Sequence, residues 1–341
     1  MIHGHGNDIH HTTYPIKADF SSNVAGRKTP DSLLRFLGTQ LETVANYPEP
    51  DSQTLRETLG KRYDVSASQV FVTNGSAEAF YLIALAYRNA RSVVCVPAFA
   101  EYEDACRMHC HAVSFQNLGD FEQTVHFQAD TVWLGNPNNP DGRLHSIECI
   151  RQKLRDNPET VFVLDEAYGE LCTGFESAVS LLSELDNLIV IKSFTKQYVL
   201  PGLRLGYAVT SRPIAEKIRP RLLPWSVNAL AQKMGMFLLN EKQEDLPDIR
   251  RLLKVSVAFQ HRLATLPNIE IIPSSCNFFL VRLLKGSSSV LKEKLLQKYG
   301  LLIRDAANFR GLDERFIRIS VQSDEDNELL YQALKKEMRL F

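Results

Sequence analysis

The stretch Leu188-Ile189-Val190-Ile191-Lys192-Ser193-Phe194-Thr195-Lys196 joins an apolar run to a polar turn that ends in a lysine. Its first four residues are apolar and three of them are β-branched, which is typical of a buried strand in a largely parallel sheet. The turn Ser193-Phe194-Thr195-Lys196 would then stand at the carboxyl end of a strand. Because ligands bind at that edge of open α/β sheets, this stretch indicates both a fold class and a site.

Similar apolar runs recur on both sides of this stretch. Further strand candidates are Val70–Thr73, Ser92–Val96, Thr131–Leu134, Val161–Leu164 and Arg204–Val209. Segments with helical spacing lie between several of them, at Glu78–Arg88, Tyr102–His109 and Ser146–Asn157. Strands that alternate with helices predict an α/β protein whose large domain has three layers, αβα, around a mostly parallel sheet.

The rest of the chain predicts a smaller α+β domain. Residues 213–266 are mainly helical, two alternating segments follow at Phe278–Arg282 and Phe316–Val321, and a final helix spans about Asp324 to Glu337. We place the large domain at residues 40–240. The small domain is placed at residues 241–341 together with the N-terminal segment, residues 1–39.

Composition favours a small-molecule partner. The formal net charge is −1 over 341 residues, so the chain offers no global field for nucleic acid or an anionic membrane. The N-terminus lacks the pattern of a secretory signal, and the apolar runs are too short to span a bilayer. Six cysteines without paired spacing indicate a reducing compartment. We therefore expect a cytoplasmic protein that binds neither nucleic acid nor membrane.

A polar cluster follows each of five strand candidates. The clusters are Asn74-Gly75-Ser76-Ala77-Glu78, Pro97-Ala98-Phe99, the run from Asn136 to Gly142, Asp165-Glu166-Ala167-Tyr168, and Ser193-Phe194-Thr195-Lys196. Together with Arg204 they supply an amine, a carboxylate, a phenol, an amide, an aromatic face and groups that bind phosphate. Pyridoxal 5′-phosphate needs this set, because its aldehyde condenses with a lysine, its pyridine nitrogen needs a buried carboxylate, and its phosphate needs N–H groups, hydroxyls and an arginine.

The chain resembles fold-type I pyridoxal-phosphate enzymes of the class I/II aminotransferase superfamily. The motifs that carry the resemblance are Asn138-Asn139-Pro140-x-Gly142, Asp165-x-Ala167-Tyr168, Ser193-Phe194-Thr195-Lys196 and Gly202-Leu203-Arg204-x-Gly206-Tyr207. The resemblance implies that Lys196 is the Schiff-base lysine and Asp165 the partner of the pyridinium. Its further implied cofactor ligands are Tyr168 and Asn139 at the 3′-oxygen, Phe99 as the stacking ring, and Ser76, Ala77, Ser193 and Arg204 at the phosphate. Tyr47 would reach the cofactor phosphate of a second subunit, which implies a homodimer.

Within the superfamily, the chain looks similar to threonine-phosphate decarboxylases and, next, to histidinol-phosphate aminotransferases. The segment Trp225-Ser226-Val227-Asn228 is the most specific feature that favours the decarboxylases. The resemblance implies decarboxylation of L-threonine O-3-phosphate to 1-amino-2-propanol O-phosphate, in cobalamin synthesis. It implies that Arg318 binds the substrate carboxylate, and we place Arg304, Asn23 and His5 among the other substrate ligands. Gln322 stands where a second arginine is expected in the decarboxylases.

Other functions are weighed against this one. An aminotransferase with a phosphorylated or aromatic substrate would use the same cofactor site. A serine acyl-enzyme built on Ser193 and Lys196 lacks the companion Ser-Asp-Asn and Lys-Thr-Gly motifs. A non-catalytic binding domain would have no reason to keep the whole cofactor set. Cys106, His109 and Cys110 share one predicted helical face, but no second ligand pair accompanies them, so no metal site is expected.

Overall fold

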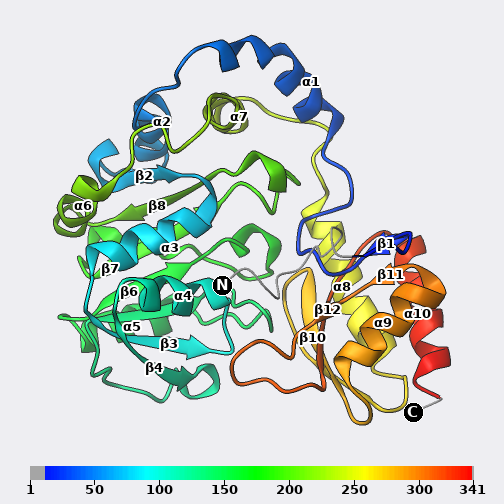
Figure 1. The fold of residues 1–341 in the computed structure, drawn as a ribbon. Helices are drawn as coiled ribbons and strands as arrows, with labels where there is room; N and C mark the ends of the chain where they lie inside the picture. The colour runs from blue at the N-terminus through cyan, green and yellow to red at the C-terminus, as the bar shows by residue number, and fades with distance from the viewer. Residues whose placement is uncertain (1–11, 340–341) are drawn as a thin grey trace.

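The computed structural model describes residues 12–339, which form two bodies around two main sheets (Figure 1). The larger sheet has seven strands in the order β2-β8-β7-β6-β5-β3-β4, and the smaller has four in the order β12-β13-β10-β9. The strands of the larger sheet are β2 (Val70–Thr73), β3 (Arg91–Val96), β4 (Ala112–Asn117), β5 (Thr131–Gly135), β6 (Val161–Asp165), β7 (Leu188–Ser193) and β8 (Gly206–Thr210). The predicted α/β class with a mostly parallel large sheet is confirmed.

One strand of the larger sheet runs against the others. β8 pairs antiparallel with both β2 and β7, whereas β3, β4, β5, β6 and β7 pair in parallel. The predicted strand start at Arg204 is wrong by two residues, because Arg204 has a positive φ of 59° after a short 3₁₀ helix, Pro201–Leu203. The reversal has a useful consequence. The beginning of β8 lies at the sheet edge where the parallel strands end.

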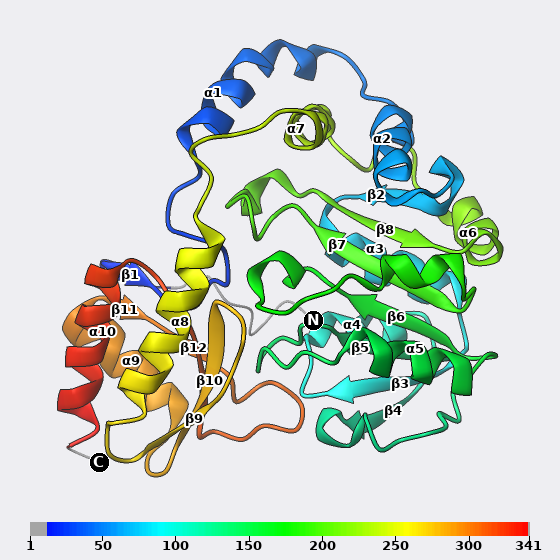
Figure 2. The same cartoon turned by 180° about the vertical axis from the view of Figure 1, so that it is seen from behind.

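Helices cover both faces of the larger sheet (Figures 1 and 2). Phe162 and Leu164 of β6 belong to a core with one helix set, while Val163 between them belongs to the core on the other face. This alternation explains why the strand is apolar throughout. The first helix set is α1 (Asp31–Thr39), α2 (Gln53–Tyr63), α5 (Ile147–Asp156) and α7 (Ala229–Asn240); the second is α3 (Gly75–Ala86), α4 (Ala100–Met108) and α6 (Arg212–Ile218).

The smaller sheet is antiparallel and has its own core. Its strands are β9 (Ile269–Ile272), β10 (Phe278–Leu283), β12 (Arg304–Asp305) and β13 (Phe316–Ser320). It packs with α8 (Ile249–Leu263), α9 (Ser288–Tyr299) and α10 (Asp324–Glu337), and the last of these matches the predicted final helix at both ends.

The start of the chain contributes to both cores. β1 (Ala18–Asp19) pairs in parallel with β11 (Leu301–Leu302), and Phe20 is buried in the core of the smaller sheet. Leu33 of α1, however, is buried in the core of the larger sheet. We therefore propose a first domain boundary before α1, rather than at residue 39. Within residues 12–339, no helix combines the length and apolarity that crossing a membrane requires.

Candidate active site

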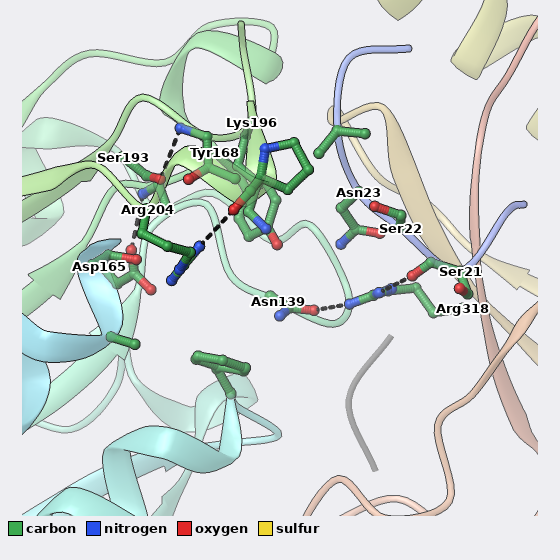
Figure 3. A pocket seen from close by; sticks show the side chains of 17 residues that line it. Ser21, Ser22, Asn23, Asn139, Asp165, Tyr168, Ser193, Lys196, Arg204 and Arg318 are labelled. Atoms are coloured by element: carbon green, nitrogen blue, oxygen red, sulfur yellow. Dashed lines mark hydrogen bonds between the residues drawn. The ribbon is translucent and has the colours of Figure 1, made fainter. Parts of the chain in front are cut away.

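A cavity of about 270 Å³ lies at the carboxyl edge of the larger sheet, where it faces the smaller sheet (Figure 3). Every predicted cofactor residue except Tyr47 lines it, as do Asn23 and Arg318 from the N-terminal segment and from β13. The fold explains this convergence. Strands β2, β3, β5, β6 and β7 end at this edge, and antiparallel β8 begins there, so residues far apart in the sequence meet.

Asp165 is the buried carboxylate of the cavity. It ends β6, and its Oδ2 accepts a hydrogen bond from the Tyr102 hydroxyl at 2.6 Å while its Oδ1 accepts one from the Ala167 N–H at 2.9 Å. Burial raises the pKa of Asp165, although these hydrogen bonds and the charge of Lys196 act in the opposite direction. A carboxylate placed in this way is suited to bind a protonated ring nitrogen.

Tyr102 is a residue that the sequence analysis did not assign to the site. It lies one helical turn after Phe99, and the centroids of the two rings are 6.0 Å apart. It is itself buried between Phe80 and Trp133. The available signal was the i, i+3 spacing, which puts Tyr102 on the same side of α4 as the predicted stacking ring.

Lys196 lies in the turn after β7, and its Nζ is 5.5 Å from the centroid of the Tyr168 ring. The backbone carbonyl of Lys196 accepts a hydrogen bond from the N–H of Ala25 at 2.9 Å, which ties the lysine turn to the N-terminal segment. Tyr168 is buried against Phe278 of the smaller sheet. The amine and the phenol therefore share one wall of the cavity (Figure 3).

Ser76 and Ala77, at the N-terminus of α3, line the cavity together with Ser193 and Arg204. A Cβ atom on Gly75 would lie 2.3 Å from Arg204 Nη2, and Gly75 has a φ of +76°. A Cβ atom on Gly206 would lie 2.5 Å from the backbone nitrogen of Ser76. Two glycines thus allow the helix, the strand and the arginine to approach closely. The helix N-terminus, hydroxyls and a guanidinium are the groups that bind a phosphate.

The donor set of this cavity fits pyridoxal 5′-phosphate. It contains an amine, a buried carboxylate, a phenol and an aromatic ring, and Ser193 and Arg204 lie across it from Arg318 (Figure 3). Any side chain at position 75 would occupy the space that Gly75 leaves beside Arg204. In this arrangement Lys196, Asp165 and Arg204 would hold the aldehyde, ring and phosphate ends of the cofactor.

Asn23 and Arg318, two of the predicted substrate ligands, line the side of the cavity next to the smaller sheet (Figure 3). Arg318 is buried, and its Nη1 and Nη2 donate to Asn139 Oδ1 and to the Ser21 carbonyl. Burial lowers the pKa of Arg318 to about 10, so the guanidinium stays cationic at neutral pH. Both polar atoms of the Asn23 amide are buried without a hydrogen-bond partner within residues 12–339. An anionic ligand could accept hydrogen bonds from Asn23 Nδ2 and from the Arg318 guanidinium, whose Nε also has no partner within residues 12–339.

Two predicted site residues, Arg304 and Tyr47, do not line the cavity. Arg304 is the cross-strand partner of Arg318 but does not line the cavity, and its Nη2 donates to Asn308 Oδ1 at 2.7 Å. Tyr47 is 85% exposed and lies beside Trp225, away from the cavity. His5 lies outside the described residues. The roles of Arg304, Tyr47 and His5 therefore stay predictions.

The possible metal ligands at the end of α4 do not gather. In the described part of the chain, the one group of His, Cys, Asp or Glu side chains close enough to share an ion consists of Glu122, His145 and Cys149. None of Cys106, His109 and Cys110 belongs to it. His145 Nδ1 and Glu122 Oε1 are 3.0 Å apart, and this hydrogen bond already accounts for the pair.

One family model accounts for most of the chain. The sequence profile of the family Aminotransferase class I and II matches residues 17–334. The chain belongs to this family. Members of the family bind pyridoxal 5′-phosphate, and a histidinol-phosphate aminotransferase from Sinorhizobium meliloti with a similar fold was solved in complex with it.

Single relatives within the family are also similar to this chain. A threonine-phosphate decarboxylase from Salmonella typhimurium is 30% identical to this chain, and the match covers 93% of this chain and 90% of the relative. The crystal structure of L-threonine-O-3-phosphate decarboxylase from Porphyromonas gingivalis has a TM-score of 0.90 and 40% identity, covering 94% of this chain and 99% of that one. The histidinol-phosphate aminotransferase from Clostridium acetobutylicum has a TM-score of 0.85 and 27% identity, covering 95% of this chain and 100% of that one.

Proposed function

We propose that this chain binds pyridoxal 5′-phosphate at Lys196 and decarboxylates L-threonine O-3-phosphate to 1-amino-2-propanol O-phosphate, a reaction of cobalamin biosynthesis. The observation that carries the proposal is the buried cation Arg318, with the amide of Asn23, in the same cavity as Lys196 and Asp165. The 40% identity to a solved decarboxylase of this substrate supports the choice of substrate.

Each proposed role assigns a residue to one part of the bound cofactor. When bound, the cofactor supplies an electron sink for the bond that breaks at the amino acid's Cα. Asp165 keeps a proton on the ring nitrogen, which preserves that sink. Lys196 anchors the cofactor, and its amine can return a proton to Cα after carbon dioxide leaves. Ser76, Ser193 and Arg204 fix the phosphate end, so that the ring cannot rotate away from Lys196.

The substrate side decides which bond breaks. The bond that stands perpendicular to the cofactor ring is the one whose electrons enter the ring system. A decarboxylase must therefore hold the carboxylate perpendicular, whereas an aminotransferase holds the C–H bond there. The two anionic groups of threonine phosphate give the protein two anchors with which to set this angle. We assign the carboxylate to Arg318 and the phosphate to the neighbourhood of Arg304, its partner across β12 and β13.

The test is release of carbon dioxide from threonine phosphate by the wild-type holoenzyme, with no 2-oxo acid present. We expect stoichiometric formation of 1-amino-2-propanol O-phosphate, and loss of turnover in Arg318→Gln with the cofactor still bound. A strict requirement for 2-oxoglutarate would contradict the proposal.

A second candidate function has a specific observation behind it. The similarity to the Clostridium acetobutylicum histidinol-phosphate aminotransferase, at 27% identity and a TM-score of 0.85, favours amino transfer to or from a phosphorylated substrate. That function predicts that an amino donor leaves the cofactor in its aminated form on the enzyme. Failure to form it with histidinol phosphate or glutamate would exclude this candidate.

We also propose a homodimer. Leu41, Val44 and Tyr47 expose 58%, 66% and 85% of their surface, and the half-exposed Trp225 lies beside Tyr47. Apolar side chains gathered on one surface indicate a protein contact. A second copy on this surface would bring Tyr47 toward the partner's cofactor phosphate.

A further inference from the structure

The connection between β12 and β13, residues 306–315, extends from the smaller sheet to the larger body (Figures 1 and 2). At the far end of this connection, Arg310 contacts the larger body. Arg310 Nε and Nη2 donate to the two carboxylate oxygens of Glu103 at 2.7 Å and 2.8 Å. Glu103 belongs to α4, which begins directly after Phe99. This ion pair therefore joins the smaller body to the helix that follows a cofactor residue.

The surroundings of Arg310 fix its geometry. Its guanidinium carbon lies 4.2 Å from the centroid of the Phe115 ring on β4, so one face of the group is covered. Glu103 also accepts a hydrogen bond from Arg107 Nε at 2.6 Å, and its side chain is 17% exposed. Paired, parallel hydrogen bonds and a stacked ring give an arginine–carboxylate contact more directional strength than an ordinary surface ion pair has.

The same connection adjoins the active site at two places. Residues Ala307–Leu312 and Phe99 line a second cavity of about 330 Å³, and Phe99 also lines the active-site cavity. The connection begins after Arg304 on β12 and ends before Arg318 on β13, and these two arginines are cross-strand partners. The point at which the far end of this connection is held therefore affects the positions of both arginines relative to the cofactor residues.

We infer that Arg310 and Glu103 are positioning residues for the substrate: their contact holds the smaller sheet so that Arg318 faces the cofactor residues of the larger sheet, with Arg304 as its cross-strand partner on β12. The inference rests on the proposed function, because it concerns the anionic groups of that substrate. The contact from Arg318 to Asn139 fixes the inner side of the same junction. Arg310 fixes it from outside and does not line the active-site cavity.

A matched pair elsewhere separates positioning from simple stabilisation. Arg262 of α8 pairs with Glu328 of α10, and its guanidinium carbon lies 3.9 Å from the centroid of the Tyr331 ring. The chemistry is that of Arg310, an arginine between a glutamate and an aromatic ring. Both partners of Arg262, however, lie in the smaller body. Loss of this pair cannot alter how the two bodies stand to each other.

The experiment compares Arg310→Gln, Glu103→Gln, the double variant and the control Arg262→Gln, all as holoenzymes. We expect KM for threonine phosphate to rise about tenfold in either single variant at the junction, with kcat within about twofold, because the contact sets the population of the binding-competent arrangement. The double variant should be no worse than the singles, since both remove one interaction. Arg262→Gln should keep the wild-type KM, and cofactor affinity should stay unchanged in all variants.

A readout without turnover keeps this inference distinct from the proposed function. We expect faster hydrogen exchange at residues 306–315 in Arg310→Gln than in the wild type or Arg262→Gln. If wild-type enzyme releases no carbon dioxide from threonine phosphate, the proposed function fails, and the dissociation constant of inorganic phosphate takes the place of KM. An unchanged KM or phosphate affinity in Arg310→Gln, or an equal change in Arg262→Gln, overturns the inference.

Discussion

At the scale of single residues, Asp165 depends on a neighbour, Tyr102, that does not line the cavity. Its carboxylate is buried at the end of β6, and burial raises its pKa. The Tyr102 hydroxyl at 2.6 Å favours the ionised form, which is the form that a protonated ring nitrogen needs. The ionised state of Asp165 in the proposed cofactor site thus depends partly on a side chain outside the cavity.

The variant Tyr102→Phe tests this dependence. We expect the pKa of Asp165 to rise further and the affinity for pyridoxal 5′-phosphate to fall roughly tenfold, the size expected for a lost hydrogen bond to a charged group. Equilibrium titration of the apoenzyme with cofactor measures the effect. Tyr81→Phe is the matched control, because Tyr81 also donates to a carboxylate, that of Glu101, outside the cavity. Equal affinities in the two variants would contradict the role of Tyr102.

The sequence predicted most residues that line the cavity but not the residues that support them. Lys196, Asp165 and Asn139 lie in short motifs directly after strands, so the rule about strand ends was sufficient to group them. Tyr102 was missed because a tyrosine within a helix carries no local mark of the partner to which it donates. The position of Arg304 outside the cavity depends on Asn308 and Phe309, which the strand pattern does not place.

At the scale of elements, the junction of α3 and β8 forms the proposed phosphate end of the cofactor site. Gly206→Ala would place a Cβ atom 2.5 Å from Ser76 N and 2.7 Å from the carbonyl carbon of Gly75, both backbone atoms. We expect cofactor affinity to fall and the free energy of unfolding to drop by about 1–3 kcal/mol, the usual range for overpacking. Urea denaturation and cofactor titration measure both effects.

Gly202→Ala is the control for that variant. It belongs to the same motif, but a Cβ atom at position 202 would meet nothing within 4 Å. Wild-type stability is expected for it. A Gly206→Ala protein as stable as Gly202→Ala, with full cofactor affinity, would show that the close approach of α3 to β8 is not needed.

The loop before α5 carries a pH dependence. His145 is buried, and burial lowers its pKa from 6.5 although the hydrogen bond with Glu122 acts in the opposite direction. His145 therefore binds a proton more readily in the unfolded chain than in the folded chain. As pH falls below 6.5, protonation of His145 favours the unfolded chain and lowers the free energy of unfolding. We expect His145→Gln to lose less unfolding free energy than wild type between pH 7 and pH 5.5, by up to about 1.4 kcal/mol per pH unit. Parallel curves for the two proteins would refute this; exposed His126→Gln serves as control.

Element prediction succeeded where burial was uniform. Strands buried on both faces, such as β6, give unbroken apolar runs and were found close to their true bounds. Strand β4 was missed because it is an edge strand with mostly exposed or half-exposed side chains. The start of β8 was misplaced because the left-handed conformation of Arg204 is set by the cavity and the adjacent turn, not by residue preference.

At the scale of the whole molecule, the cavity requires both bodies. Lys196 and Asp165 come from the larger sheet, while Arg318 comes from β13 and Asn23 from the N-terminal segment. The alternation of strands and helices predicted each body. How the bodies face each other could not be predicted, because single contacts such as those of Arg318 with Asn139 and Arg310 with Glu103 fix it.

The proposed dimer predicts complementation between inactive subunits. If Tyr47 completes the partner's site, mixing Lys196→Ala with Tyr47→Ala subunits forms hybrids in which one site has both native residues. Activity should reappear, up to about a quarter of the wild-type value if subunits exchange at random. Assay after refolding the mixture measures it. A mixture as inactive as its parts would contradict the role of Tyr47 across an interface.

Attachment of the cofactor to Lys196 is the central claim, and one measurement tests it most directly. Holoenzyme is reduced with borohydride, which makes the attachment permanent, and its peptides are then analysed by mass spectrometry. We predict that the peptide containing Lys196 carries the reduced pyridoxal phosphate and that Lys196→Ala shows neither the label nor the yellow absorption of the wild type. A label on another lysine, or none on a protein saturated with cofactor, would contradict the account.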